Sequence, residues 1–193
     1  MKKFFALGAA MAAVACSAPA MAQDAEVQGG VSFGVVGGYD HVTLSGGGEK
    51  ESKDGFAYGA VLGYDKVIGQ GTVGVEAEID GTTVKERNDV YSIKGGVDLY
   101  AGARAAYAVA PGLSVYAKAG YTNTRVRVDY GNRYGVNVDG FRVGGGVEAA
   151  VTKQIAARVE YRYSDYGHTY VANVDTGISA RRQQVMAALV TRF

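Results

Sequence analysis

Apolar residues alternate with polar or small residues along most of the chain, with a period of two. Val31, Phe33 and Val35 begin the first such segment, and the same alternation returns in seven later segments. Successive side chains of a β-strand point to opposite faces, whereas an amphipathic helix repeats its apolar positions every three or four residues. The pattern therefore predicts eight strands, within residues 31–39, 56–64, 73–79, 97–107, 113–121, 141–149, 155–163 and 185–193.

The second face of these predicted strands carries charged residues of both signs. A soluble β-sandwich also alternates, with its polar face turned to water. Alternation by itself therefore leaves the environment of the two faces open. The charged positions that we assign to the inside of a closed sheet are Glu76, Glu78, Asp98, Arg104, Lys118, Arg142, Glu148, Arg158, Glu160 and Arg162.

The connections between the predicted strands alternate between short and long. The short ones fall near residues 65–71, 110–112 and 152–154, and the long ones at 45–55, 81–94, 125–140 and 164–180. Outer-membrane barrels have tight periplasmic turns and longer outer loops. Because lipid offers no hydrogen bonds, a spanning sheet must also close on itself. The sequence thus predicts an all-β fold, an eight-stranded antiparallel up-and-down transmembrane β-barrel with both termini on the periplasmic side.

Aromatic residues on the apolar face are sorted by strand end, which a soluble sandwich has no reason to do. They predict two girdles that flank a lipid-facing band about 25 Å tall. The periplasmic girdle comprises Tyr64, Tyr107 and Phe193. The outer girdle comprises Tyr39, Phe56, Tyr58, Tyr121, Phe141, Tyr161 and Tyr163.

The first 22 residues have the features of a secretory signal peptide. Lys2 and Lys3 precede an apolar stretch over residues 4–16, and small residues lead to a cleavage site between Ala22 and Gln23. A membrane anchor is disfavoured, since a spanning helix needs about 20 apolar residues. A lipoprotein would start at Cys16, which lacks the usual leucine three residues earlier. We expect residues 23–193 to form the barrel domain.

Composition narrows the function classes. The single cysteine lies in the leader, so disulfides and cysteine metal sites are excluded from the mature chain, and we expect no cofactor. Loss of Lys2 and Lys3 changes the formal charge from +1 to −1. A near-neutral chain disfavours nucleic acid as a partner, because nucleic-acid binding normally requires a basic patch.

The segment VEYRYSDYG, residues 159–167, and the terminal Phe193 resemble small eight-stranded outer-membrane barrels of Gram-negative bacteria, the OmpA-like and opacity-type surface proteins. The resemblance covers the whole chain. It implies outer-membrane lipid, periplasmic chaperones and the barrel-assembly machinery as partners. The end of the chain is similar to the signal that this machinery reads, with Thr191 standing where a larger residue is commoner. The residues of that signal are Val185, Ala187, Leu189 and Phe193.

Three functions remain open. In the first, the barrel has a structural role in the outer membrane, and its interior charges pair to form a plug. In the second, the protein is a small low-conductance porin, gated by exchange of partners among those charges. In the third, its loops bind a host surface or a ligand such as haem. The loop at 45–55 is charged and glycine-rich, which predicts mobility. A loop rim is predicted from Asn132, Arg133, Tyr134, Tyr166, His168 and Tyr170.

We do not expect an enzyme. The chain holds only two histidines, His41 and His168, and no nucleophile motif surrounds the serines near them. Metalloprotease, phosphate-loop and dinucleotide fingerprints do not occur.

Overall fold

The computed structural model describes residues 28–46, 49–87, 92–94, 96–130, 132–171 and 174–193. The predicted signal peptide and its cleavage site, Ala22 and Gln23, lie outside these residues. Within the described chain, no helix is long and apolar enough to cross a membrane.

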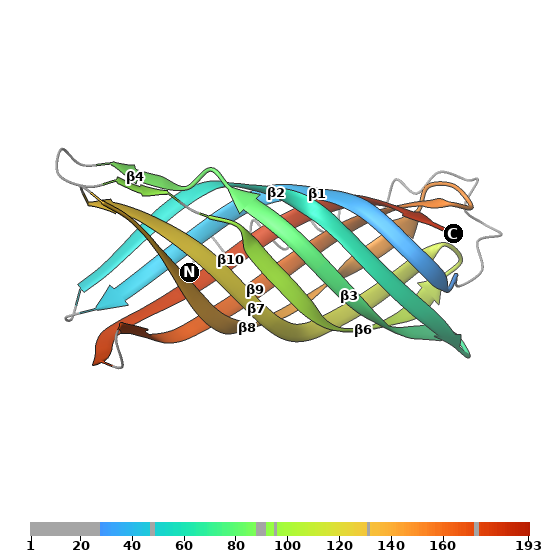
Figure 1. Ribbon diagram of the computed structural model, residues 1–193. Helices are drawn as coiled ribbons and strands as arrows, with labels where there is room; N and C mark the ends of the chain where they lie inside the picture. The colour runs from blue at the N-terminus through green and yellow to red at the C-terminus, as the bar shows by residue number, and fades with distance from the viewer. Residues whose placement is uncertain (1–27, 47–48, 88–91, 95, 131, 172–173) are drawn as a thin grey trace.

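Eight strands form a closed antiparallel wall, which confirms the predicted fold class (Figure 1). Going round the barrel, the order is β7-β6-β3-β2-β1-β10-β9-β8, and β8 pairs with β7 to close the ring. The wall strands are β1 (Gly30–Gly46), β2 (Glu49–Ile68), β3 (Gly71–Thr82), β6 (Asp98–Ala110), β7 (Leu113–Tyr130), β8 (Asn132–Ala150), β9 (Ile155–Val171) and β10 (Val174–Arg192).

Pairing of the first strand with the last brings the two ends of the described chain together. In this pair Val35 lies opposite Leu189, and the Phe193 amide donates to the Val31 carbonyl at 2.9 Å. Every wall strand therefore has a neighbour on both sides within the membrane band. Lipid cannot hydrogen-bond to backbone groups, so this closure is what allows a sheet to span it.

One end of the barrel carries the three short connections, and we call it the turn end. Only Gly69 and Gln70 separate β2 from β3, and Pro111 and Gly112 separate β6 from β7. Gly69 and Gly112 adopt φ values of 60° and 69°, which glycine tolerates without strain. Short turns face the periplasm in outer-membrane barrels. The other end is called the loop end.

At the loop end the structure corrects the sequence pattern. The segments 45–55, 125–140 and 164–180 are predicted as loops, yet they are mostly strand, and β1 and β2 stay paired as far as Gly46 and Glu49. The fourth segment contains a short hairpin, β4 (Lys85–Arg87) and β5 (Ser92–Lys94). Above the membrane both faces of a strand meet water, so pairing continues although apolar alternation stops.

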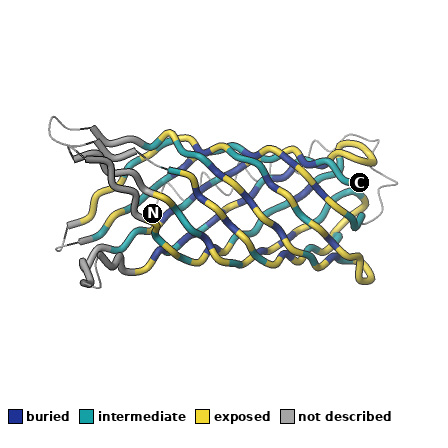
Figure 2. Tube along the Cα trace, in the orientation of Figure 1, coloured by how far each residue is buried: buried dark blue, intermediate teal, exposed yellow. Residues whose placement is uncertain are grey.

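The wall alternates between outward and inward residues along its length (Figure 2). Val35 is 58% exposed, whereas its neighbour Val36 is 6% exposed. The outward set is apolar all round the middle of the barrel, as a lipid-facing band requires. All ten predicted girdle residues belong to the outward face, nine of them exposed and Tyr163 half-buried.

Candidate functional site

The barrel interior holds the largest cluster of charged side chains in the described chain. All ten residues of the predicted charge network are buried there. They occupy the inward positions of β3, β6, β7, β8 and β9, where parity along each strand turns their side chains away from lipid. The network has a layer near the turn end, a middle layer and a layer near the loop end.

The layer near the turn end is centred on the Glu148 carboxylate. Its two oxygens accept from Arg104 Nη2 at 2.8 Å, Arg158 Nε at 2.5 Å and Arg192 Nη2 at 2.6 Å. Asp65 supports Arg104 through a bond of 2.7 Å from Nη1. Charge-assisted bonds of this length are among the strongest hydrogen bonds in proteins.

The middle layer is centred on the Lys118 ammonium group. Its Nζ lies 2.9 Å from Glu76, 2.6 Å from Glu78 and 2.9 Å from Glu160. The Tyr116 hydroxyl donates to Glu160 at 2.7 Å. One buried cation is thus shared by three carboxylates, so its removal would leave all three less well compensated.

In the layer near the loop end, Arg142 donates to Ser164 at 3.0 Å, to Asp98 at 2.6 Å and, at longer range, to Glu78 and Asp80. This guanidinium is completely buried, so every one of its partners lies inside the barrel.

Two more guanidiniums complete this layer. Arg182 bonds Asp40 at 2.7 Å and Asp98 at 2.5 Å. Arg162 bonds Glu78 at 2.8 Å and Asp80 at 3.2 Å, and its Nε also donates to Glu160. Arg162 therefore links the loop-end layer to the middle one.

Two buried tyrosines bind the layers through their rings. Tyr116 lies under Arg104 and Arg158, with ring centroid distances of 4.5 and 5.7 Å. Tyr100 lies beside Lys118 and Arg142 at 5.0 and 5.3 Å. Cation–π contacts of this kind add about 2 kcal/mol or more where the partners are desolvated.

The other side of the interior is apolar. Val36, Ala57 and Met186 pack together on β1, β2 and β10, and Ala188 lies against them. A void of about 10 Å³ remains between this cluster and the charged side, where Glu78, Arg158 and Arg162 border it. That is close to the smallest space able to hold one water.

Comparison with known proteins places the chain in a family. Residues 8–193 match the model of the outer membrane protein beta-barrel domain. The chain belongs to this family. It is therefore an outer-membrane β-barrel protein, and the predicted location in the cell outer membrane is confirmed.

Curated relatives include the 25 kDa outer-membrane immunogenic proteins of Brucella abortus and Brucella melitensis. Each is 31% identical over 99 residues, which cover 49% of this chain and 45% of the relative. The chain thus spans about half the length of the curated relatives it matches.

Among solved structures, Neisserial surface protein A matches with a TM-score of 0.60 at 21% identity, covering 85% of this chain and 99% of that one. Ail, the attachment invasion locus protein of Yersinia pestis, matches with 0.54 at 14% identity, covering 84% and 99%. These likenesses show the fold.

In this outer-membrane barrel, neighbouring strands do not always supply the partner of a buried charge. Arg104 on β6 does not pair with Glu76 or Glu78 on the adjacent β3, and it bonds Asp65 and Glu148 instead. The register explains this pairing: Glu76 lies opposite Gly102, and Arg104 lies opposite Gly74, one inward position nearer the turn end. Lys118 reaches the two glutamates from β7.

The ten predicted residues leave out five charged members of the network, which are Asp40, Asp65, Asp80, Arg182 and Arg192. Each lies near or just beyond an end of a predicted strand. The alternation of inward and outward positions could have identified two of them. Asp40 continues the inward positions of β1 after Val36, and Arg182 precedes the inward positions Gln184 and Met186 on β10.

The outer face near the loop end holds a chain of hydrogen bonds. His41 Nδ1 lies 2.6 Å from Asp54, and its Nε2 lies 3.4 Å from the Thr43 hydroxyl. This order of hydroxyl, imidazole and carboxylate has the form of a hydrolase triad. However, β1 is paired on both sides here, so its backbone N–H groups are committed to the sheet and do not serve as oxyanion donors beside Thr43.

Of the six predicted rim residues, only Tyr166 has a side chain within the described part of the chain. Tyr166 is buried and contacts Asp98 and Thr124 rather than forming a surface rim. The side chains of Asn132, Arg133, Tyr134, His168 and Tyr170 lie outside the described part. At the outer girdle, the Tyr121 hydroxyl and the Asn123 amide donate to Asp139 and hold the pKa of its carboxyl below the usual range. Among the described residues, no group of three or more His, Cys, Asp or Glu side chains is placed so that it could hold a metal ion.

Proposed function

We propose that this protein is a structural outer-membrane barrel that presents long hairpins at the cell surface and whose interior is closed to ions. The observation that supports a closed interior is the filling of the barrel by paired side chains, and the void that lies between the charged and apolar sides measures about 10 Å³. A hydrated ion needs the space of several water molecules, whereas such a void holds at most one water molecule.

Energetics supports the same conclusion. A continuous path would require several of the interior pairs to separate together, for example Arg142 from Asp98 and Lys118 from Glu78. Breaking one buried pair costs about 3–5 kcal/mol. Two broken pairs would hold the open state below about one molecule in ten thousand.

Conductance in planar bilayers tests the closed barrel. We expect the refolded wild type, shown to be folded by its heat-modifiable migration on gels, to give no channel events. Regular single-channel openings of the wild type would overturn the proposal and favour the porin alternative. Arg142→Ala removes the cation with the most partners in the loop-end layer, so this variant should open a leak if the pairs are the barrier.

A second candidate function is recognition at the cell surface. It is supported by the strand edges at the loop end. Among the described residues, the ladder between β2 and β3 begins at Ala57, whereas the ladder between β2 and β1 extends to Glu49. Within the described chain β4 pairs only with β5. Exposed edges of this kind accept an added strand from another protein.

Adhesion of bacteria that carry the barrel tests this second function. We expect replacement of residues 43–52 by a two-residue turn to reduce binding to cultured epithelial cells, with normal barrel levels in the membrane. A matched variant that shortens the hairpin between β9 and β10 leaves the β2 edge intact. Equal binding by the wild type and both variants would argue against recognition through either hairpin.

A further inference from the structure

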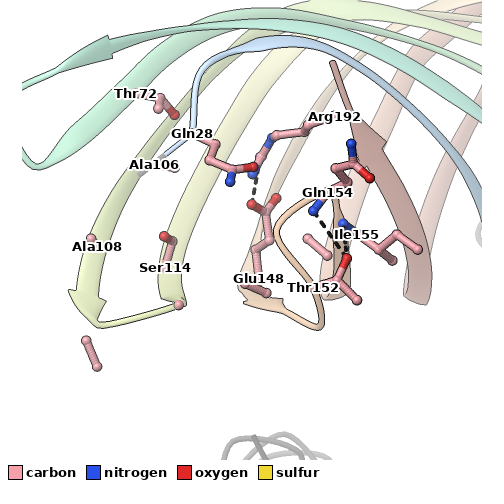
Figure 3. Close-up of a pocket in the computed structure, with 14 residues that line it drawn as sticks. Gln28, Thr72, Ala106, Ala108, Ser114, Glu148, Thr152, Gln154, Ile155 and Arg192 are labelled. Atoms are coloured by element: carbon pink, nitrogen blue, oxygen red, sulfur yellow. Dashed lines mark hydrogen bonds and ion pairs between the residues drawn. The ribbon is translucent and has the colours of Figure 1, made fainter. Parts of the chain in front are cut away.

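The charges at the two ends of the barrel are balanced in different ways. At the turn end, a pocket of about 50 Å³ is lined by Arg192 and Glu148, which bond each other at 2.6 Å (Figure 3). The charges of that pocket are thus compensated within the barrel. At the loop end, the hairpin of β4 and β5 adds to β7 beyond the outer girdle (Figure 1). Basic residues are concentrated on this added part of the sheet.

The register of the hairpin places basic residues directly opposite each other. Lys85 on β4 pairs with Lys94 on β5, and Lys94 pairs in turn with Arg127 on β7. Residues opposite each other in antiparallel strands share a face of the sheet, and like charges in such positions destabilise the pairing. The fold therefore keeps three basic positions in one row, and a bound anion would remove the resulting repulsion.

This row belongs to the outward face of the sheet. On β7, Lys118 is buried inside the barrel, whereas Tyr121 and Arg125 are exposed on the outside. Successive residues of a strand alternate between the faces, so position 127 takes the outward face of Arg125 and shares it with its register partners. The alternate positions of the same strands are mostly apolar, namely Val126, Val128 and Ile93.

Charge on this outward face is one-sided. We call the outward positions 123–129 of β7, with the positions that pair to them, the basic face. Its basic residues are Lys85, Arg87, Lys94, Arg125, Arg127 and Arg133. Its acidic residues are Asp129 and Asp139, and Asp139 already accepts from Tyr121 and Asn123. Glu86 has the other parity. Six basic residues against two acidic ones give a positive potential, which attracts anions.

The outward face of β10 has a different balance at the same height. Arg181 pairs in the ladder with Thr43, which lies four residues beyond Tyr39 of the outer girdle. Its Nε lies 3.5 Å from the Asp165 carboxylate, so this exposed cation has an acidic partner. A basic residue at this height thus does not by itself produce a positive surface, and Arg181 provides a matched control.

The height of the basic face indicates the kind of anion. Arg125 lies four residues beyond Tyr121 of the outer girdle, which is about 13 Å along the strand and about 10 Å along the axis of a tilted barrel. The polar region of a phospholipid leaflet extends about 5–8 Å beyond the hydrocarbon, and a sugar headgroup extends further. Arginine and lysine carry their charge on long stems that reach back toward the membrane. The basic face therefore stands beside lipid headgroups.

We propose that the basic face binds the phosphate groups of the glycolipid headgroups that surround the barrel in the outer leaflet. Arginine suits this ligand because its planar guanidinium donates two parallel hydrogen bonds to a phosphate. The bound phosphates also neutralise the opposed basic residues of the hairpin, so binding stabilises β4 and β5 on the wall. The proposal concerns the face of the hairpin rather than its edges, and it is independent of whether the interior conducts.

Titration of the folded barrel in detergent micelles, followed by amide NMR shifts, tests the site. The probe is lipid A, the phosphorylated anchor of lipopolysaccharide, and the control is lipid A without its phosphates. We expect saturable shifts at Asn123, Arg125 and Asn137 with the phosphorylated form only, weaker at high salt. Heparin represents a soluble polyanion. The proposal is overturned if both forms of lipid A bind alike, or if heparin shifts these amides and lipid A does not.

Variants separate binding from folding. The double variant Arg125→Gln, Arg127→Gln should weaken lipid A binding about 25-fold, at about fivefold for each basic residue removed. Arg181→Gln should bind like the wild type. Lys94→Gln should weaken binding about fivefold without lowering the unfolding free energy in neutral lipid, because it removes like-charge pairs. Normal binding by the double variant, an equal loss in Arg181→Gln, or a less stable Lys94→Gln barrel would each overturn the proposal.

Discussion

Lys118 Nζ and a Glu78 carboxylate oxygen lie 2.6 Å apart, although their strands, β7 and β3, are not neighbours in the wall. β6 runs between them. The bond therefore spans β6 on the inner side of the wall and joins two strands that share no backbone ladder. Arg158 and Glu76 are joined across the lumen itself, because their strands, β9 and β3, lie on opposite sides of the ring.

Replacing the central cation should destabilise the barrel strongly. We expect Lys118→Met to lower the free energy of unfolding by about 3–5 kcal/mol, because Glu76, Glu78 and Glu160 lose their shared partner while staying buried. Urea unfolding in lipid vesicles, followed by gel migration, measures this. Ala119→Met, on the lipid face of the same strand, is the control. A Lys118→Met barrel as stable as the control would show that this charge contributes little.

The apolar side of the lumen should behave like an ordinary protein core. Met186 is 1% exposed and packs against Val36 and Ala57. We expect Met186→Ala to cost about 2–5 kcal/mol, because it leaves a cavity that the rigid wall does not close. Ala187→Met adds the same side chain on the lipid face and should be nearly neutral. Equal effects of the two changes in an unfolding titration would contradict this view of the interior.

The free-energy cost of placing a charged residue on the lipid-facing band should depend on its depth in the membrane. Val35 is central on the outward face of β1, and Thr43 lies beyond the outer girdle on the same face. We expect Val35→Arg to cost about 2–4 kcal/mol and Thr43→Arg about 0–1 kcal/mol. Folding yield and unfolding free energy in vesicles check both values. A larger cost for Thr43→Arg would mean that the membrane band is wrongly placed.

Deletion of Phe193 should separate assembly from stability. The side chain is 82% exposed, so it adds little packing, and its described role in the ring is the bond from its amide to Val31. We expect the truncated chain to refold in vesicles with nearly wild-type stability, yet to reach the outer membrane of cells in reduced amount. Normal cellular levels would remove the assembly role proposed for Val185, Ala187, Leu189 and Phe193.

The sequence was enough to predict which residues face lipid and which face inward, because successive residues of a strand point to opposite faces. Val35 and Val36, or Ala187 and Met186, must point to opposite faces once the segment is a strand. The extent of the strands was harder to predict. In β1 the apolar alternation ends near Tyr39, but pairing with β2 continues to Gly46, where water on both faces removes the pattern.

By itself the sequence determined an eight-stranded barrel in the outer membrane, the face that each side chain takes, and the charged character of the lumen. Only the tertiary structure decided which acid meets which base. That choice depends on the register of each pair and on reach across the lumen, as when Gly102 opposite Glu76 leaves that acid to Lys118. The pocket beside Arg192 also emerged only there, because its walls come from strands far apart in the chain.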